Sequence, residues 1–280
     1  MKKKENEEEE FLQNASVLAR SDDRQALARA AVVLAGSAHP QAQQTLGSFL
    51  RRREFLARLD NLSDVHQKTY NLRAVLEALR SHPTPVSASI CVTLANDPAF
   101  LEEPDRLIWL LPALSAVRPM SEEGAELFLK TNNEGFFAGN APLLVANGSE
   151  RALSLFESMI RDSSVDPESR IDAVHNAVLP HRTDAPVLES AGRLLGGGLA
   201  PEVETGVVET LFDFQYRRWF GPAIGAPRPP AWESGSDEAL QLVLRLADRV
   251  KSRRDLPAEL ADAVNRTAAE VRDILAARKK

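Results

Sequence analysis

The chain has 280 residues, of which 44% are hydrophobic and 26% are charged, and its formal net charge is −6. Such a composition is ordinary for a globular protein and allows a sizeable core, whereas the acidic balance argues against a protein that depends on a basic footprint for nucleic acid. The single cysteine, Cys91, excludes an intramolecular disulfide and a multi-cysteine metal site.

The N-terminal segment is charged. Met1-Lys2-Lys3-Lys4 is followed by acidic residues up to Glu10, not by the apolar stretch of a signal peptide. Apolar runs such as 107–114 are too short to cross a bilayer. We therefore expect residues 1–10 to form a charged, frayed N-terminus. We also expect a cytoplasmic protein, with an exported domain that has lost its targeting segment as the alternative.

From residue 11 onwards the apolar spacing is helical nearly everywhere. Apolar residues recur every three or four positions, which places them on one face of a helix. Examples are Leu107, Leu111, Leu114 and Val117, and later Val203, Val207 and Leu211. Aromatic residues make up only 6% of the chain, and no run alternates apolar with polar residues as a strand does. The pattern predicts an all-α fold of short helices.

Prolines and short polar residues mark the expected helix starts. Proline is tolerated in the first turn of a helix, and Asp or Ser before it can cap the free N–H groups. We expect starts after Ser21-Asp22-Asp23, Ser121 and Asp166, and at or near Pro40, Pro83, Pro119, Pro167, Pro186, Pro201 and Pro257. The short loops between these helices favour antiparallel neighbours.

Parts of this pattern repeat. Gly36-Ser37-Ala38-His39-Pro40 and Leu79-Arg80-Ser81-His82-Pro83 both lie between helical segments, 43 residues apart. That interval falls within the range of roughly 40–47 residues of HEAT and armadillo units. The interval therefore favours a helical-repeat protein.

Three segments resemble HEAT repeats. Leu110-Leu111-Pro112-Ala113-Leu114 is similar to the bent end of a HEAT first helix. The stretch 166–173 (DPESRIDA) resembles the turn and second-helix start, and 21–28 (SDDRQALA) is a looser match. The resemblance implies an all-α, right-handed stack of antiparallel helix pairs, a HEAT-like α-solenoid whose surface binds partners. A non-repetitive helical bundle is the alternative.

We expect residues 11–220 to form the helical-repeat domain, 221–236 a Pro/Gly-rich loop, and 237–280 a C-terminal helix pair that packs on the same domain. The end of the repeat region and the loop are rich in aromatic residues and arginine, which dominate the binding energy of protein interfaces. The candidate binding residues there are Tyr216, Arg217, Arg218, Trp219 and Trp232.

Two adjacent phenylalanines, Phe136 and Phe137, lie in a turn-rich stretch and form a second candidate binding site. For both clusters, packing in the core or over the end of the helical stack is the competing interpretation. Gly196-Gly197-Gly198 lacks the strand and the lysine of a phosphate-binding loop and is interpreted as a helix end followed by a turn.

The residues predict no catalytic centre. Asp172 and His175 are three apart on one helix, but no second pair has the spacing of metal ligands, so we expect no metal and no cofactor. We expect a non-catalytic protein-interaction scaffold that binds a protein or peptide, with no nucleic-acid partner, as a monomer or weak homodimer. The alternatives are a HEAT-like enzyme of the DNA glycosylase type and a structural or oligomerisation module.

Overall fold

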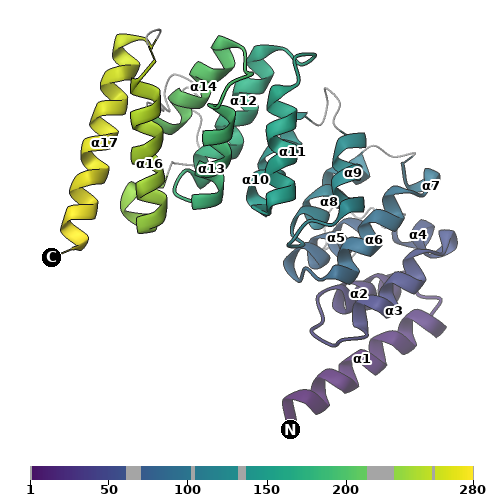
Figure 1. Ribbon diagram of the computed structural model, residues 1–280. Coiled ribbons are helices and arrows are strands. Elements are labelled where there is room, and N and C mark those ends of the chain that lie inside the picture. Colours follow the sequence, from purple (N-terminus) through teal and green to yellow (C-terminus); the bar gives the residue numbers. More distant parts are fainter. Residues whose placement is uncertain are drawn as a thin grey trace. The chain divides into compact units, whose positions relative to one another are not determined.

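The computed structural model describes residues 2–60, 71–101, 105–131, 137–212, 230–253 and 256–279, and all their regular elements are helices (Figure 1). The all-α prediction is confirmed for these ranges. None of the helices described combines the length and apolar composition that a membrane crossing requires. Contacts divide the chain into two compact units, residues 1–128 and 129–280. This boundary falls within 11–220, which we predicted to be one repeat domain.

The first unit is built from short helices, and the last of them runs two residues past the unit boundary. They are α1 (Lys2–Arg20), α2 (Arg24–Ala35), α3 (Ala42–Leu50), α4 (Arg53–Asp60), α5 (Leu72–Ser81), α6 (Pro85–Ala95), α7 (Pro98–Leu101), α8 (Asp105–Ser115) and α9 (Glu122–Lys130). Helix α1 begins inside the charged segment 1–10. Helix α2 packs on α1 and α5, α5 packs on α8, and α3 packs on α6.

The second unit contains α10 (Phe137–Asn147), α11 (Glu150–Arg161), α12 (Pro167–Val178), η1 (Leu179–His181), α13 (Ala185–Leu194), α14 (Pro201–Phe212), η2 (Trp232–Ser234), α16 (Asp237–Lys251) and α17 (Ala258–Arg278). Alternate helices contact each other in two rows. One row is α10, α12, α14 and α17, and the other is α11, α13 and α16. The two C-terminal helices thus pack on the helices that precede them.

The expected helix starts have the expected caps. The Asp23 carboxylate accepts hydrogen bonds from the backbone N–H groups of Gln25 and Ala26, and Asp166 accepts one from Ser169 at 2.8 Å. The Ser121 hydroxyl accepts one from Gly124 at 3.1 Å. These side chains satisfy N–H groups that have no partner within their helices, so the caps predicted at these three starts are confirmed.

The apolar face of each helix forms the core of its unit. Cys91 is fully buried beside apolar neighbours on α6, and this burial raises the pKa of its thiol to about 12. The periodic residues Leu111, Leu114 and Val117 are buried in the first unit, and Val203, Val207 and Leu211 in the second. The helical periodicity therefore identified core positions correctly in both units.

In the first unit, one buried glutamine joins two neighbouring helix pairs. The Gln43 side-chain amide donates hydrogen bonds of 2.9 Å to the carbonyls of Ala35 and His82, and the Thr84 hydroxyl donates to the Gln43 side-chain oxygen. Gln43 thus connects the α2–α3 loop to the α5–α6 loop, the two segments that repeat at an interval of 43 residues. Equivalent loops of successive pairs are neighbours here.

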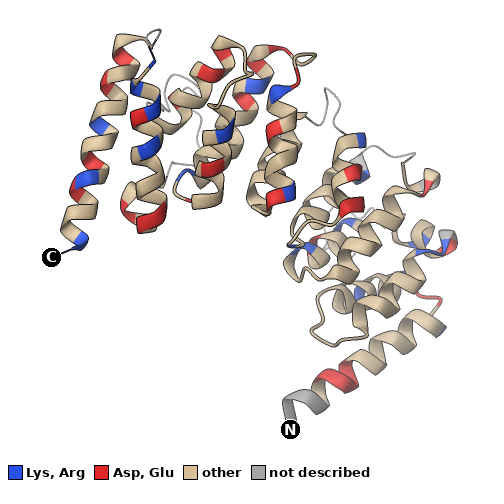
Figure 2. Cartoon of the chain, viewed as in Figure 1, with Lys and Arg blue, Asp and Glu red and all other residues tan. Residues whose placement is uncertain are grey.

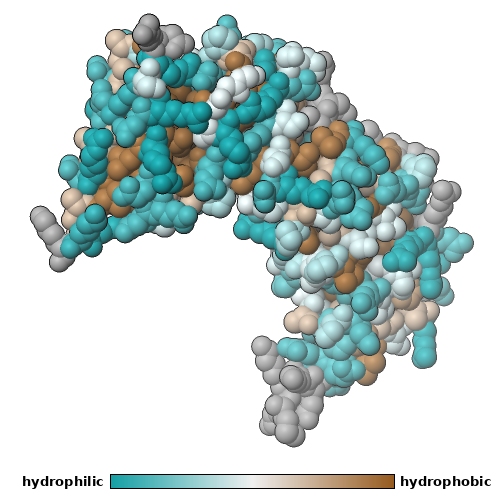
Figure 3. Space-filling view, in the orientation of Figure 1, coloured by the Kyte–Doolittle hydropathy of each residue, from teal (hydrophilic) through white to brown (hydrophobic). Residues whose placement is uncertain are grey.

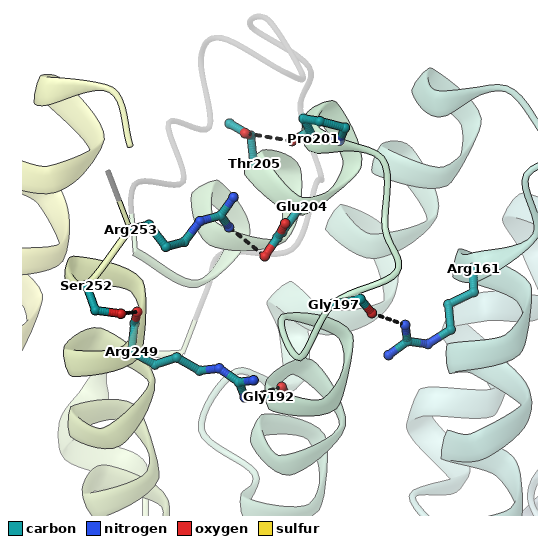
Figure 4. Close-up of polar contacts among 9 residues, drawn as sticks. All are labelled: Arg161, Gly192, Gly197, Pro201, Glu204, Thr205, Arg249, Ser252 and Arg253. Carbon is teal, nitrogen blue, oxygen red and sulfur yellow. Dashed lines mark hydrogen bonds and ion pairs between the residues drawn. The ribbon is translucent and has the colours of Figure 1, made fainter. Parts of the chain in front are cut away.

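In the second unit, arginines at the ends of α11 and α16 make the corresponding connections (Figure 4). Arg161, the last residue of α11, donates to the carbonyls of Arg193 (2.6 Å) and Gly197. Arg249, near the end of α16, donates to the Gly192 carbonyl at 3.0 Å. Because all these atoms lie near helix C-termini, α11, α13 and α16 end on the same side of the unit. Cationic side chains are favourable there because the C-terminal end of a helix carries the partial negative charge of the helix dipole.

Candidate functional site: an arginine-lined groove between α13 and α16

Most of the binding residues predicted from the sequence lie outside the described residues. Tyr216, Arg217, Arg218 and Trp219 fall in the range 213–229, and Phe136 falls in 132–136. Their role in binding stays a prediction. The structure describes the other two residues, Trp232 and Phe137.

Trp232 and Phe137 are both only 3% exposed. Trp232 lies in η2, where the guanidinium carbon of Arg182 sits 4.4 Å from the ring centroid. Arg182 also donates two hydrogen bonds to the Pro230 carbonyl, and its burial lowers its pKa from the ordinary arginine value. As placed, these two aromatic rings offer little surface to a partner and contribute mainly to packing.

A second arginine holds the same segment against α17. Arg278 donates to the carbonyls of Glu233 (2.6 Å) and Gly235 (3.0 Å) and pairs with the Asp237 carboxylate at 2.7 Å. Residues 230–237 are therefore attached at both ends, by Arg182 and by Arg278. This attachment fixes the point at which the chain enters α16.

In the second unit, a groove with a volume of about 700 Å³ lies between α13 and α16. Its lining includes three arginines and one glutamate, and the apolar part of the lining, here called its floor, consists of leucines. The lining residues are Leu188, Glu189, Gly192, Arg193, Gly196, Leu242, Arg245, Leu246 and Arg249. On the face shown in Figure 3, the region over these two helices has apolar surface flanked by hydrophilic side chains.

Glycine allows the two helices to approach each other. A Cβ atom at Gly192 would lie 3.1 Å from Cδ2 of Leu246, closer than most carbon–carbon contacts. Beyond the end of α13, Gly197 and Gly198 have φ values of 116° and 87°. Since side chains rarely adopt such values, these glycines allow the chain to turn away from the helix end. The turn predicted for Gly196-Gly197-Gly198 is confirmed.

The arginines of the groove differ in what they already bind. Arg193 pairs with the Glu157 carboxylate at 2.7 Å, which also accepts a hydrogen bond from Ser190, and the bond to Glu157 raises the pKa of Arg193. Arg249 uses one N–H group on the Gly192 carbonyl. Arg245 is exposed and makes no hydrogen bond or ion pair with any residue that the structure describes.

Figure 2 shows the charge pattern of α16. The helix is red at its first turn, where Asp237 and Glu238 lie, and carries more blue towards its end. Acidic residues at the start and basic residues at the end both suit the helix dipole. The dipole acts only within the terminal turns, however, and Arg245 lies further inside the helix. Its position is not explained by capping.

The groove was not predicted from the sequence. Arg193 belongs to α13 and Arg245 and Arg249 belong to α16, and only the packing of these helices brings them together. The pair Arg245 and Arg249 at four-residue spacing was a usable signal, because such a pair lies on one helix face. The first unit has a separate groove of about 550 Å³ between α6 and the segment 117–121.

Other chemistry is limited in the part of the chain that the structure covers. Within those ranges, no group of three or more His, Cys, Asp or Glu side chains is arranged to hold a metal ion. His175 is 1% exposed, and its burial lowers its pKa to about 4, so it is neutral near pH 7. No family model, no curated protein and no solved structure matches the chain.

Proposed function

We propose that this chain is a non-catalytic interaction scaffold that binds a protein or peptide on a HEAT-like helical-repeat surface. Within each unit, helices contact the helices two or three places further along the chain, as expected when helix pairs stack. Polar side chains at the pair junctions support the same arrangement, namely Gln43 in the first unit and Arg161 and Arg249 in the second.

The α13–α16 groove is the binding surface that we propose. Arginine is enriched in interface hot spots, where its planar group makes several hydrogen bonds at once. The main support for choosing this groove is the state of Arg245. It is exposed at a groove with an apolar floor and is not engaged by any residue within the described ranges.

A crosslinking experiment tests the proposal. A photoreactive amino acid would replace Glu189, which lines the groove, or Glu259, which is exposed in the first turn of α17. Each protein would be used for affinity capture from the native source, and crosslinked partners would be identified by mass spectrometry. We expect a partner that crosslinks from position 189 and not from position 259.

A second part of the experiment distinguishes binding at the groove from binding at the aromatic segment predicted from the sequence. The same capture would be repeated with Arg245→Gln and with the Arg218→Ala/Trp219→Ala double variant. Loss of the partner with Arg245→Gln alone supports the groove, whereas loss with the double variant alone moves the site to 213–229. If crosslinks form equally from both positions and neither variant loses the partner, the proposed function is wrong for this surface.

A further inference from the structure

The groove between α13 and α16 has an excess of positive charge, because three arginines and only one glutamate line it. Arg245 and Arg249 are one turn apart on the same face of α16, and like charges at this spacing destabilise a helix. Arg193 faces them from α13, and its charge is already matched by Glu157. A bound anionic group would relieve the repulsion between Arg245 and Arg249.

Both arginines of α16 have N–H groups available for such a ligand. A guanidinium has five N–H donors. Arg249 uses only its Nη1 group, on the Gly192 carbonyl, and Arg245 uses none on the residues described. The Gly192 contact also holds the Arg249 side chain in place against α13. Since a guanidinium binds a carboxylate by donating two parallel hydrogen bonds, each arginine can bind one carboxylate.

The rest of the groove favours a polypeptide over a nucleic acid. Leu242 and Leu246 are 8% and 6% exposed and give the groove a small apolar surface, beneath which Leu188 is fully buried. Glu189 also lines the groove, and its carboxylate can accept a hydrogen bond from a backbone N–H group of a peptide. A peptide supplies carboxylates, apolar side chains and N–H groups together.

The spacing of the arginines indicates the form of the peptide. Four residues of helix place Arg245 and Arg249 roughly 6 Å apart along α16. Alternate residues of an extended chain are about 6.6 Å apart and point to the same side. We infer that the groove binds an extended acidic peptide in which two carboxylate side chains, two residues apart, pair with Arg245 and Arg249. This inference rests on the proposed function and specifies its partner.

Fluorescence anisotropy with defined peptides tests the inference. The probe is a fluorescein-labelled 12-residue peptide with a central Glu-Leu-Glu, and the control peptide has Gln-Leu-Gln instead. We expect the Glu peptide to bind at least about tenfold more tightly, because each lost carboxylate removes a charge-assisted pair. We expect Arg245→Gln to weaken its binding by about tenfold.

Arg272→Gln is the matched control variant. Arg272 is an exposed arginine of α17 outside the groove, 3.9 Å from Asp248, and its replacement changes the net charge by the same amount. We expect its peptide affinity to stay within about twofold of wild type. Circular dichroism melting of each variant checks that the fold is kept, which we expect because the side chains of Arg245 and Arg272 are both exposed.

Three results would overturn the acidic-peptide assignment: equal affinity for the Glu and Gln peptides, equal weakening by Arg245→Gln and Arg272→Gln, or tighter binding of single-stranded DNA of equal charge. The proposed function is tested separately with the captured partner. If the Glu peptide fails to bind at about 1 mM while Arg245→Gln still weakens that partner, the scaffold stands and the acidic assignment fails. If the Glu peptide binds as expected and Arg245→Gln weakens it, the inference holds.

Discussion

The two units join their helix pairs with different chemistry. In residues 1–128 the α2–α3 and α5–α6 loops are connected by Gln43, a neutral side chain that is 4% exposed. In residues 129–280 the ends of α11, α13 and α16 are connected by Arg161 and Arg249, which are charged and lie at the surface. Both solutions place side-chain donors on backbone carbonyls at helix ends, where the last carbonyls have no partner within the helix.

The difference separates a structural junction from one that can also bind a ligand. The hydrogen-bonding groups of Gln43 are engaged within the protein and hidden from solvent. The arginine junction leaves N–H groups of Arg249 at the surface, and Arg245 lies one turn away. We therefore expect substitutions at the glutamine junction to affect stability most and substitutions at the arginine junction to affect binding most.

The largest effect is expected at Gln43. In Gln43→Leu, the buried Ala35 carbonyl loses its side-chain partner, and the His82 carbonyl and the Thr84 hydroxyl each lose a partly buried hydrogen bond. We expect a loss of about 3 kcal/mol in the free energy of unfolding, since each buried polar group left unsatisfied costs roughly 1–3 kcal/mol. Urea denaturation measures this. Gln44→Leu, at an exposed position of the same helix, should change stability by less than about 0.5 kcal/mol.

The second effect depends on pH and belongs to the core of the second unit. The pKa of His175 is about 4 in the folded protein and close to 6.5 in the unfolded chain, so the unfolded state takes up the proton first as pH falls. This site contributes fully to stability above pH 6.5. As the pH falls from the higher to the lower of these two pKa values, we expect the free energy of unfolding to decrease by about 3 kcal/mol.

Unfolding curves at a series of pH values check this expectation. In His175→Gln, the decrease in the free energy of unfolding over that pH interval should be smaller than in wild type by the amount that His175 contributes. If His175→Gln kept the full slope, another group would control the acid sensitivity.

Packing between α12 and α14 gives the third effect. A Cβ atom at Gly206 would lie 2.8 Å from Cγ1 of Ile171, so in Gly206→Ala either the Ile171 side chain or the two helices must shift. We expect a loss of about 1–2 kcal/mol, the usual range for overpacking. Adding Ile171→Ala should make the glycine substitution less harmful. Gly139→Ala, in α10 where a Cβ meets nothing within 4 Å, should instead stabilise by up to about 1 kcal/mol.

The smallest stability effects are expected for substitutions of the arginines at the α13–α16 junction. Arg249→Gln removes a charge-assisted bond to the Gly192 carbonyl and should cost about 1 kcal/mol. Arg245→Gln should change stability by less than about 0.5 kcal/mol. Thermal melts of the two variants measure the difference. An equally large loss for Arg245→Gln would mean that this residue has a structural role.

Much of the helical structure could be predicted from local sequence signals. Asp166 and Pro167 mark the start of α12 because capping and the fixed proline backbone act within one turn. The buried positions followed from the periodicity of residues such as Val203 and Val207, which depends on the same helix geometry. Local chemistry therefore carried the information on where helices begin and which face they bury.

The candidate site could not be predicted in the same way. Arg193 and Arg245 are far apart in the sequence, and their proximity depends on Gly192, which allows α13 and α16 to pack closely. Trp232 illustrates the opposite problem. Aromatic residues are common both in interface hot spots and in cores, and only the structure shows that this ring is buried under Arg182.

The affinity of the captured partner for wild type, Arg245→Gln and Arg272→Gln shows whether the α13–α16 groove holds that partner. Isothermal titration calorimetry would give the three dissociation constants with unlabelled proteins. We expect Arg245→Gln to weaken binding by about tenfold and Arg272→Gln to leave it within about twofold. Equal affinity for all three proteins would contradict the account, because it would show that the α13–α16 groove does not hold the partner.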